Sequence, residues 1–200
     1  MTMNILVAGA TGKTGRQVLQ ALIDQGHKPT ALVRESSDTS DLPHDVDLRN
    51  GDLTDLPSDV CDKMDVVIFA AGSGGATSAE MTDKVDRDGA KKLVDLAARS
   101  GVKRFVMLSS VGADKVNPTG ELAHYLKAKH EADAHLKASG LTYAILRPVA
   151  LTDDARHEDV TLGDDVDTSA TAARADVAYL LAEAATTGRL DGQALNMQSS

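Results

Sequence analysis

The chain has 200 residues, of which 42% are hydrophobic, and a formal net charge of −9. This length and apolar share are typical of one domain with a full hydrophobic core. The acidic balance argues against nucleic acid as a partner, because the 21 lysines and arginines form no basic run.

Apolar runs typical of strands alternate with the apolar periodicity of helices along the whole chain. The predicted strands cover residues 4–8, 29–34, 46–50, 66–71, 104–109, 142–147 and 194–197. The predicted helices cover residues 12–25, 84–100, 121–139 and 174–186. Gly26, Gly101 and Gly140 follow three of these helices, where a left-handed glycine commonly ends a helix. The alternation predicts an α/β fold with a doubly wound parallel sheet flanked by helices.

The first predicted strand begins at Asn4, which leaves no room for a signal peptide. The longest apolar runs, such as residues 65–71, are too short to cross a bilayer. Cys61 is the single cysteine, so it forms no internal disulfide, and no cysteine or histidine spacing indicates a metal site. We therefore expect a cytoplasmic protein with no membrane partner and no metal.

A glycine-rich turn, with the sequence GATGKTG at residues 9–15, connects the first strand to the first helix. This order is typical of a dinucleotide-phosphate cradle. Gly9 permits the sharp exit from the strand, Gly12 lets the backbone approach a pyrophosphate, and Gly15 lets the helix pack on the sheet. Val7 stands where a P-loop requires glycine, which argues against a nucleoside-triphosphate site. Lys13 is then either a solvated loop residue or an outer phosphate contact.

The end of the second predicted strand lies beside the adenosine ribose in such folds. Here it carries Arg34, followed by Glu35, Ser36 and Ser37. An arginine can pair with a 2′-phosphate and serines can donate hydrogen bonds to it, which favours NADP(H) over NAD(H). Alternatively, Arg34 is a solvated cation that Glu35 partly neutralises.

The ends of the third and fourth predicted strands offer further cofactor contacts. Asp52 is placed either to meet the adenine amino group or to cap a short helix near Thr54. Ala70, Ala71 and Gly72 end the fourth strand, where small side chains let a cofactor lie against the backbone.

A second group of polar residues follows the fifth predicted strand. Ser109 and Ser110 end that strand, and Tyr125 and Lys129 lie four residues apart on one face of the next helix. An ammonium near a phenol favours the ionised phenol, so Tyr125 is a candidate acid–base group, with Ser110 hydrogen-bonding the substrate oxygen. A tyrosine four residues before a lysine is also common on amphipathic helices without any catalytic role.

Two surface features bear on substrate and partners. The stretch 152–169 is polar and rich in aspartate, and is either a mobile substrate loop or a solvated surface turn. The helix 121–139 carries Lys127, His130, Glu131 and Lys137 at positions that we expect to face outward. This polar face favours a monomer or a weak homodimer.

Together these residues resemble an atypical short-chain dehydrogenase/reductase, in the NAD(P)-binding group that includes NmrA-like regulators, flavin and biliverdin reductase-like proteins, and epimerase/dehydratase-like proteins. The resemblance rests on Gly9–Gly15, Arg34, Gly51-Asp52, Ala71-Gly72, Val85–Gly89, Ser109–Ala113, Tyr125 with Lys129, Ser139–Leu141, and Leu146–Pro148. It implies a single Rossmann domain over residues 1–200, with a small substrate-side segment at about 148–173. The chain departs from the pattern at Val149, where the family usually has glycine, and we expect this residue to face the substrate.

The resemblance also implies a set of site residues and a function. The catalytic residues would be Ser110, Tyr125 and Lys129. The cofactor contacts would be Gly9, Thr11, Gly12, Lys13, Thr14, Gly15, Arg34, Asp52, Leu53, Ala70, Ala71, Gly72, Ser109, Lys129 and Pro148. The expected function is NADP(H)-dependent hydride transfer to a small carbonyl or conjugated substrate. The alternatives are a flavin or quinone reductase without tyrosine chemistry, and an NmrA-like sensor that binds the nucleotide without turnover.

Overall fold

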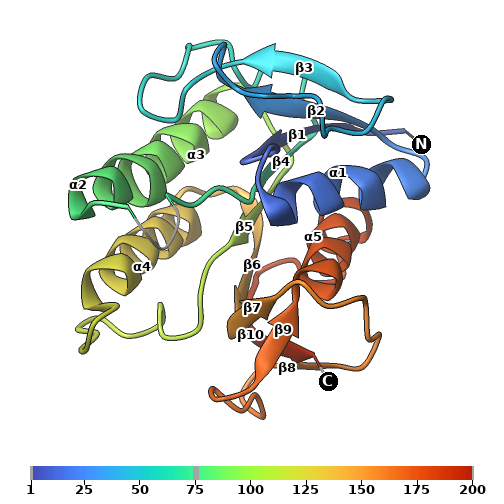
Figure 1. Ribbon diagram of the computed structural model, residues 1–200. Coiled ribbons are helices and arrows are strands. Elements are labelled where there is room, and N and C mark those ends of the chain that lie inside the picture. Colours follow the sequence, from blue (N-terminus) through green and yellow to red (C-terminus); the bar gives the residue numbers. More distant parts are fainter. Residues whose placement is uncertain (1, 74–76, 200) are drawn as a thin grey trace.

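The computed structural model describes residues 2–73 and 77–199, and its centre is an eight-stranded sheet (Figure 1). The strand order is β3-β2-β1-β4-β5-β6-β10-β8. All neighbours are parallel except β8, which pairs antiparallel with β10. The strands are β1 Asn4–Ala8, β2 Lys28–Val33, β3 Asp47–Asn50, β4 Val66–Phe69, β5 Arg104–Leu108, β6 Thr142–Pro148, β8 Val160–Leu162 and β10 Gln193–Ser199.

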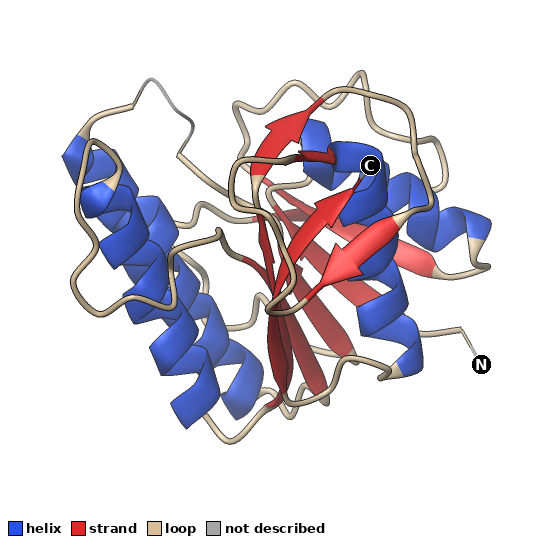
Figure 2. Ribbon diagram, turned by 90° about the horizontal axis from the view of Figure 1, so that it is seen from below, coloured by secondary structure: helices blue, strands red, loops and turns tan. Residues whose placement is uncertain are grey.

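Helices cover both faces of this sheet (Figure 2). One layer contains α1 Lys13–Asp24 and α5 Arg174–Thr187, which pack on each other. The other contains α3 Ala90–Arg99 and α4 Ala123–Ala138. The short α2 Ala79–Thr82 and the π-helical η1 Asp83–Gly89 precede α3. The structure thus confirms the predicted doubly wound Rossmann fold.

The strand β1 shows how the sheet divides the core. Ile5 and Val7 pack into the apolar cluster that contains α1 and α5, whereas Leu6 and Ala8 pack into the cluster that contains α3. Successive side chains of a strand point to opposite faces, so one apolar run serves both helix layers. Because β2 and β4 lie on either side of β1, the connections after β1 and β4 diverge and leave a crevice at their carboxyl ends.

The predicted elements agree closely with the observed ones, except in two regions. The helix predicted at 84–100 starts earlier, as α2, and continues through the π-helix η1 before it becomes α3. Within the polar region after β6, a second small sheet pairs β7 Ala150–Thr152 with β9 Thr171–Ala173, and β8 adds to the edge of the main sheet. These strands have three residues each, too few to produce a periodic signal in the sequence.

Val149 does not face the substrate side, contrary to the sequence prediction. It is 3% exposed and packs in the core cluster next to α5. Its backbone N–H donates to the carbonyl of Met197 in β10. The residue therefore belongs to the core and is not among the residues that line the large cavity.

Three further observations concern the classes of site considered from the sequence. No helix in residues 2–73 and 77–199 is long and apolar enough to cross a membrane. The same residues contain no cluster of three or more potential metal ligands. Cys61 is buried, and burial raises the pKa of its thiol to about 12, so it is not a reactive nucleophile.

Candidate functional site

A cavity of about 850 Å³ opens at the carboxyl ends of β1, β2, β4 and β5. It brings together most of the residues that the sequence singled out. Those that line it are Gly9, Thr11, Gly12, Lys13, Thr14, Arg34, Asp52, Leu53, Ala70, Ala71, Gly72, Ser109, Tyr125 and Lys129. Gly15, Ser110 and Pro148 are not among the lining residues.

The glycine-rich turn forms one end of the cavity in close contact with β4. Gly9 has φ of +80°, and a Cβ there would come within 2.5 Å of the Ala71 backbone. A Cβ on Gly15 would collide with the carbonyl oxygen of Gly9, so only glycine lets α1 pack this closely. Within residues 2–73 and 77–199, no side chain caps the amino end of α1, and its first turn holds no acidic residue. The free amides and the helix dipole therefore face the cavity as a site suited to an anion.

The Lys13 side chain is 61% exposed, but it has a charged partner. Its ammonium forms an ion pair with Asp153, and the same carboxylate pairs with Arg174 at the start of α5. Both cations line the cavity. The Lys13 hydrogen bond, with Arg174, lowers the pKa of Asp153. One exposed carboxylate thus joins two cations at the rim of the cavity.

Arg34 lies at the end of β2 and is exposed on the cavity wall. A turn holds it in place, because the Ser37 hydroxyl accepts from the Arg34 N–H and the Ser37 N–H donates to the Arg34 carbonyl. Ser37 also lines the cavity. Among the described residues, the guanidinium forms no ion pair, with Glu35 or any other carboxylate.

Asp52 caps a turn at Thr54 and not a helix, and its contact with adenine stays a prediction. One carboxylate oxygen accepts hydrogen bonds of 2.8 Å from both the amide and the hydroxyl of Thr54. These bonds lower the pKa of Asp52. The residue therefore caps a turn while also lining the cavity.

Tyr125 and Lys129 lie on α4 and line the cavity at the end away from the glycine turn. The ammonium of Lys129 lies 5.7 Å from the centre of the Tyr125 ring and 5.6 Å from that of Phe69. It is 3.0 Å from a carboxylate oxygen of Asp86 and donates to the carbonyl of Ala71 at 3.3 Å. Burial lowers the pKa of Lys129, but the charges of Tyr125, Asp86 and Asp133 outweigh burial and hold it above its ordinary value. The ammonium is therefore charged at neutral pH.

The two serines after β5 have different surroundings. The Ser109 hydroxyl donates to Asp133 at 3.0 Å, and Arg147 donates to the same oxygen at 2.9 Å. Burial raises the pKa of Asp133, although Arg147 and Ser109 oppose that effect. The Ser110 hydroxyl donates a long hydrogen bond of 3.4 Å to the neighbouring carbonyl of Val111, its only one among the described residues. Ser109 is thus the serine on the cavity, and the role of Ser110 stays a prediction.

Part of the cavity is built from residues that sequence reasoning missed. Of the predicted substrate-side segment 148–173, only Leu151 is a lining residue. The wall beside Tyr125 comes instead from α2, η1 and the start of α4. These residues are Ala79, Met81, Thr82, Val85, Leu122 and His124. In the sequence, the only signal of Met81 and Leu122 is that they are large hydrophobic residues outside the apolar faces of the predicted helices.

The outward face predicted for α4 is partly occupied within the chain. His130 contacts the carbonyl of Ala113 at 2.8 Å, and Glu131 pairs with Lys91 at 3.2 Å. Lys127 and Lys137 are exposed. The helix surface available to a partner is therefore smaller than the sequence suggested.

Comparison with known proteins gives a consistent family. A model described as NAD(P)H-binding matches residues 9–187. The Bacillus subtilis protein named "uncharacterized sugar epimerase YhfK" is 36% identical over 158 residues, which are 76% of this chain and 74% of that protein.

Two solved structures share the whole fold. A protein from Bacillus halodurans, described as an NAD-dependent epimerase/dehydratase, is 34% identical with a TM-score of 0.90, covering 99% of this chain and 94% of that one. The oxidoreductase ylbE from Lactococcus lactis is 30% identical with a TM-score of 0.86, covering 99% and 91%. The likeness extends over the sheet and both helix layers.

Proposed function

The chain belongs to the NAD(P)H-binding family whose model spans residues 9–187, and from this premise we propose that it is a cytoplasmic oxidoreductase that uses NADP(H). Its substrate is a small carbonyl or conjugated compound. The observation that carries the cofactor preference is Arg34, an exposed guanidinium without a carboxylate partner among the described residues, on the cavity wall at the end of β2. With Ser37 it supports binding of a 2′-phosphate.

The glycine turn supports the pyrophosphate contact. The start of α1 offers amides to an anion, and Gly12 at its cap position adds no side chain there. Gly9 and Gly15 let the turn pack closely against β4 and α1. The reduced nicotinamide supplies a hydride when it is bound. Residues 70–72 lie at the adjacent edge of the sheet, where a planar ring can rest against the backbone.

The residues on α4 support proton transfer. Tyr125 lies on the cavity and can donate its hydroxyl proton to the substrate oxygen. Lys129 remains charged below it, which favours the phenolate left after that transfer. One hydride and one proton complete the reduction of a carbonyl to an alcohol.

Nucleotide titration tests the cofactor part of this proposal. Binding of NADPH and NADH would be followed by nucleotide fluorescence at two salt concentrations, for the wild type, Arg34→Gln and Arg189→Gln. Loss of a charge-assisted contact should weaken NADPH binding about tenfold or more in Arg34→Gln and leave NADH binding unchanged. Arg189→Gln, which removes an exposed cation at the far end of α5, is the matched control. Equal NADPH affinity in both variants would remove Arg34 from the site.

Substitution of Tyr125 tests the reaction. Tyr125→Phe should reduce NADPH-dependent turnover of a carbonyl about a hundredfold while NADPH still binds. Tyr143→Phe, on β6 and outside the cavity lining, is the control. Nucleotide binding without turnover of any carbonyl, quinone or flavin would point instead to a sensor similar to NmrA-like regulators.

One observation favours a second candidate, reduction of a flavin or quinone without tyrosine chemistry. Met81 and Leu122 line the cavity although they are 37% and 63% exposed, and such apolar surface suits a flat aromatic acceptor. In that case Tyr125→Phe should leave quinone turnover intact.

A further inference from the structure

The buried ion pair below Tyr125 contains a carboxylate that the proposed reaction does not use. Asp86 is fully buried, and one of its oxygens lies 3.0 Å from the ammonium of Lys129. Its other oxygen accepts a hydrogen bond of 2.9 Å from the N–H of Ser73, in the connection after β4. A buried carboxylate destabilises the folded protein unless it is paired, so a buried Asp86 beside Lys129 indicates a specific role for the pair.

The local backbone brings Asp86 to this position. It lies in η1, a π-helical stretch of the kind that often occurs at functional sites. Gly89 lets η1 approach the cavity wall, because a Cβ there would come within 2.8 Å of the Leu53 carbonyl oxygen. Thr82 of α2 forms a second hydrogen bond to the connection after β4, because its hydroxyl lies 3.1 Å from that of Ser73.

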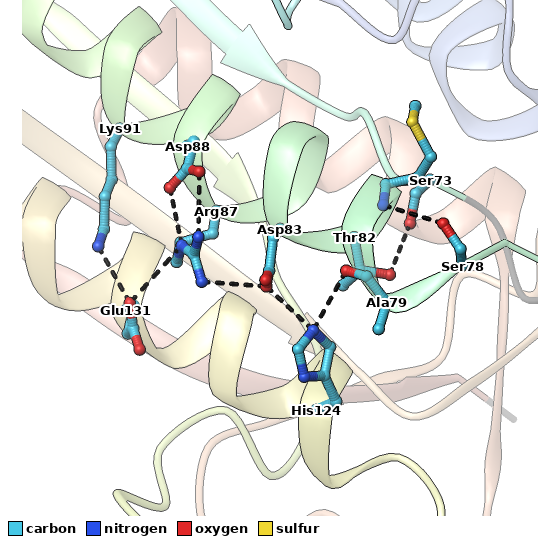
Figure 3. Close-up of polar contacts among 11 residues, drawn as sticks. Ser73, Ser78, Ala79, Thr82, Asp83, Arg87, Asp88, Lys91, His124 and Glu131 are labelled. Atoms are coloured by element: carbon cyan, nitrogen blue, oxygen red, sulfur yellow. Dashed lines mark hydrogen bonds and ion pairs between the residues drawn. The ribbon is translucent and has the colours of Figure 1, made fainter.

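A polar network on the outer side fixes η1 against α4 (Figure 3). Arg87 pairs with Asp83 at 3.0 Å and lies 3.9 Å from Glu131 of α4. His124, at the start of α4, lies 3.0 Å from Asp83 and 3.2 Å from the carbonyl of Ala79. These contacts set the position of η1 relative to α4, and therefore of Asp86 relative to Lys129.

We propose, on the basis of the proposed function, that Asp86 is a positioning residue that holds Lys129 charged on the floor of the cavity where the dinucleotide binds. Five groups of the described residues surround the ammonium: the carboxylate of Asp86 from η1, the rings of Phe69 and Tyr125, and the carbonyls of Ala71 and Leu108.

Asp86 is the partner that keeps the charge in place. The other nearby carboxylate, Asp133, is already engaged by Arg147 and Ser109. Without the Asp86 charge, one of the contributions that oppose burial is lost, so the pKa of Lys129 should fall.

The first readout needs no nucleotide. Lysine labelled with carbon-13 at Cε would be followed by NMR from pH 6 to 11 in the wild type, Asp86→Asn and Asp176→Asn. The Lys129 titration should move to lower pH by about one unit or more in Asp86→Asn. It should not move in Asp176→Asn, a buried aspartate of α5 that accepts from the amides of His157 and Glu158 and pairs with Arg156 at 3.7 Å. An unchanged Lys129 titration in Asp86→Asn overturns the proposal.

The second readout is the affinity for NADPH from pH 6.5 to 9.5. Asp86→Asn should weaken binding about tenfold at the alkaline end relative to pH 7, whereas the wild type should show no such loss. Because Lys129→Met alone would leave Asp86 buried without a partner, the double variant Asp86→Asn with Lys129→Met serves as the reference. The double variant should bind NADPH weakly, with no further loss of affinity at alkaline pH. If its affinity falls at alkaline pH as that of Asp86→Asn does, Asp86 does not act through Lys129.

The two readouts separate this proposal from the proposed function. A wild type that binds neither NADPH nor NADH overturns the function, while the NMR titration still decides whether Asp86 holds the charge of Lys129. Normal NADPH binding with an unmoved Lys129 titration overturns the role of Asp86 alone. Urea denaturation of each variant shows that the comparison is made between folded proteins.

Discussion

The two ends of the cavity are built in different ways. At the end formed by the glycine turn, backbone amides line the cavity, and the nearby cations Lys13 and Arg34 are exposed. At the α4 end, the charges of Lys129 and Asp86 are buried and paired. Exposed cations can exchange partners at little cost, whereas buried charges must be paired before any ligand arrives. The difference teaches that the charges at one end are free to rearrange, whereas those at the other end are held by buried partners.

Removing one member of a buried pair should have the largest effect. Asp133→Ala leaves the guanidinium of Arg147, 8% exposed, without its carboxylate. We expect a loss of about 3–5 kcal/mol in the free energy of unfolding. Urea denaturation would measure it, with Glu80→Ala as the control for an exposed pair with Lys84, where we expect only a small fraction of that loss. Similar losses of unfolding free energy in the two variants would mean that the buried pair contributes no more to stability than the exposed one.

Substitution of two glycines in the turn should have different effects, one mainly on the free energy of unfolding and the other mainly on NADPH binding. Gly15→Ala forces a Cβ against the Gly9 carbonyl and should cost about 1–3 kcal/mol in unfolding free energy. Gly12 has φ of −74°, and its Cβ would lie 3.2 Å from the same oxygen, so Gly12→Ala should fold nearly normally but bind NADPH more weakly. Denaturation and nucleotide titration of both variants test this. Equal stability of the two would show that the packing at Gly15 is not limiting.

The smallest effect is expected at the rim. Asp153→Asn should free Lys13 and Arg174 for a phosphate and tighten NADPH binding about threefold at low salt. The matched control is Asp41→Asn, which removes an exposed carboxylate paired with Arg16 outside the cavity lining. Fluorescence titration at two salt concentrations measures both. Weaker binding in Asp153→Asn would mean that Asp153 orders the rim and does not compete with the ligand.

The pH dependence of this rim contact has a definite sign. Lys13 and Arg174 lower the pKa of Asp153 below its ordinary value of 3.8. The carboxylate is therefore ionised above that value, and its competition with phosphate disappears only as the pH falls through the lowered pKa. The gain in affinity of Asp153→Asn should consequently be the same at pH 6 and pH 8.

Much of the fold could be predicted because its signals are local. The apolar run at β1 and the glycine turn after it specify a strand, a turn and a helix start within a dozen residues. Gly26, Gly101 and Gly140 all have positive φ, as their positions after helices predicted. The region after β6 was harder to predict, since three-residue strands depend on partners elsewhere in the chain.

The sequence by itself determined the order of strands and helices, the parallel sheet and the edge where Gly9, Arg34 and Ala71 meet, because periodicity and glycine geometry act over short distances. It also placed Tyr125 and Lys129 on one helix face. Only the tertiary structure decided which charges meet: Lys129 with Asp86, Ser109 and Arg147 with Asp133, and Lys13 with Asp153. These partners lie far apart in the chain, and the packing of helices on the sheet selects them from many equivalent aspartates.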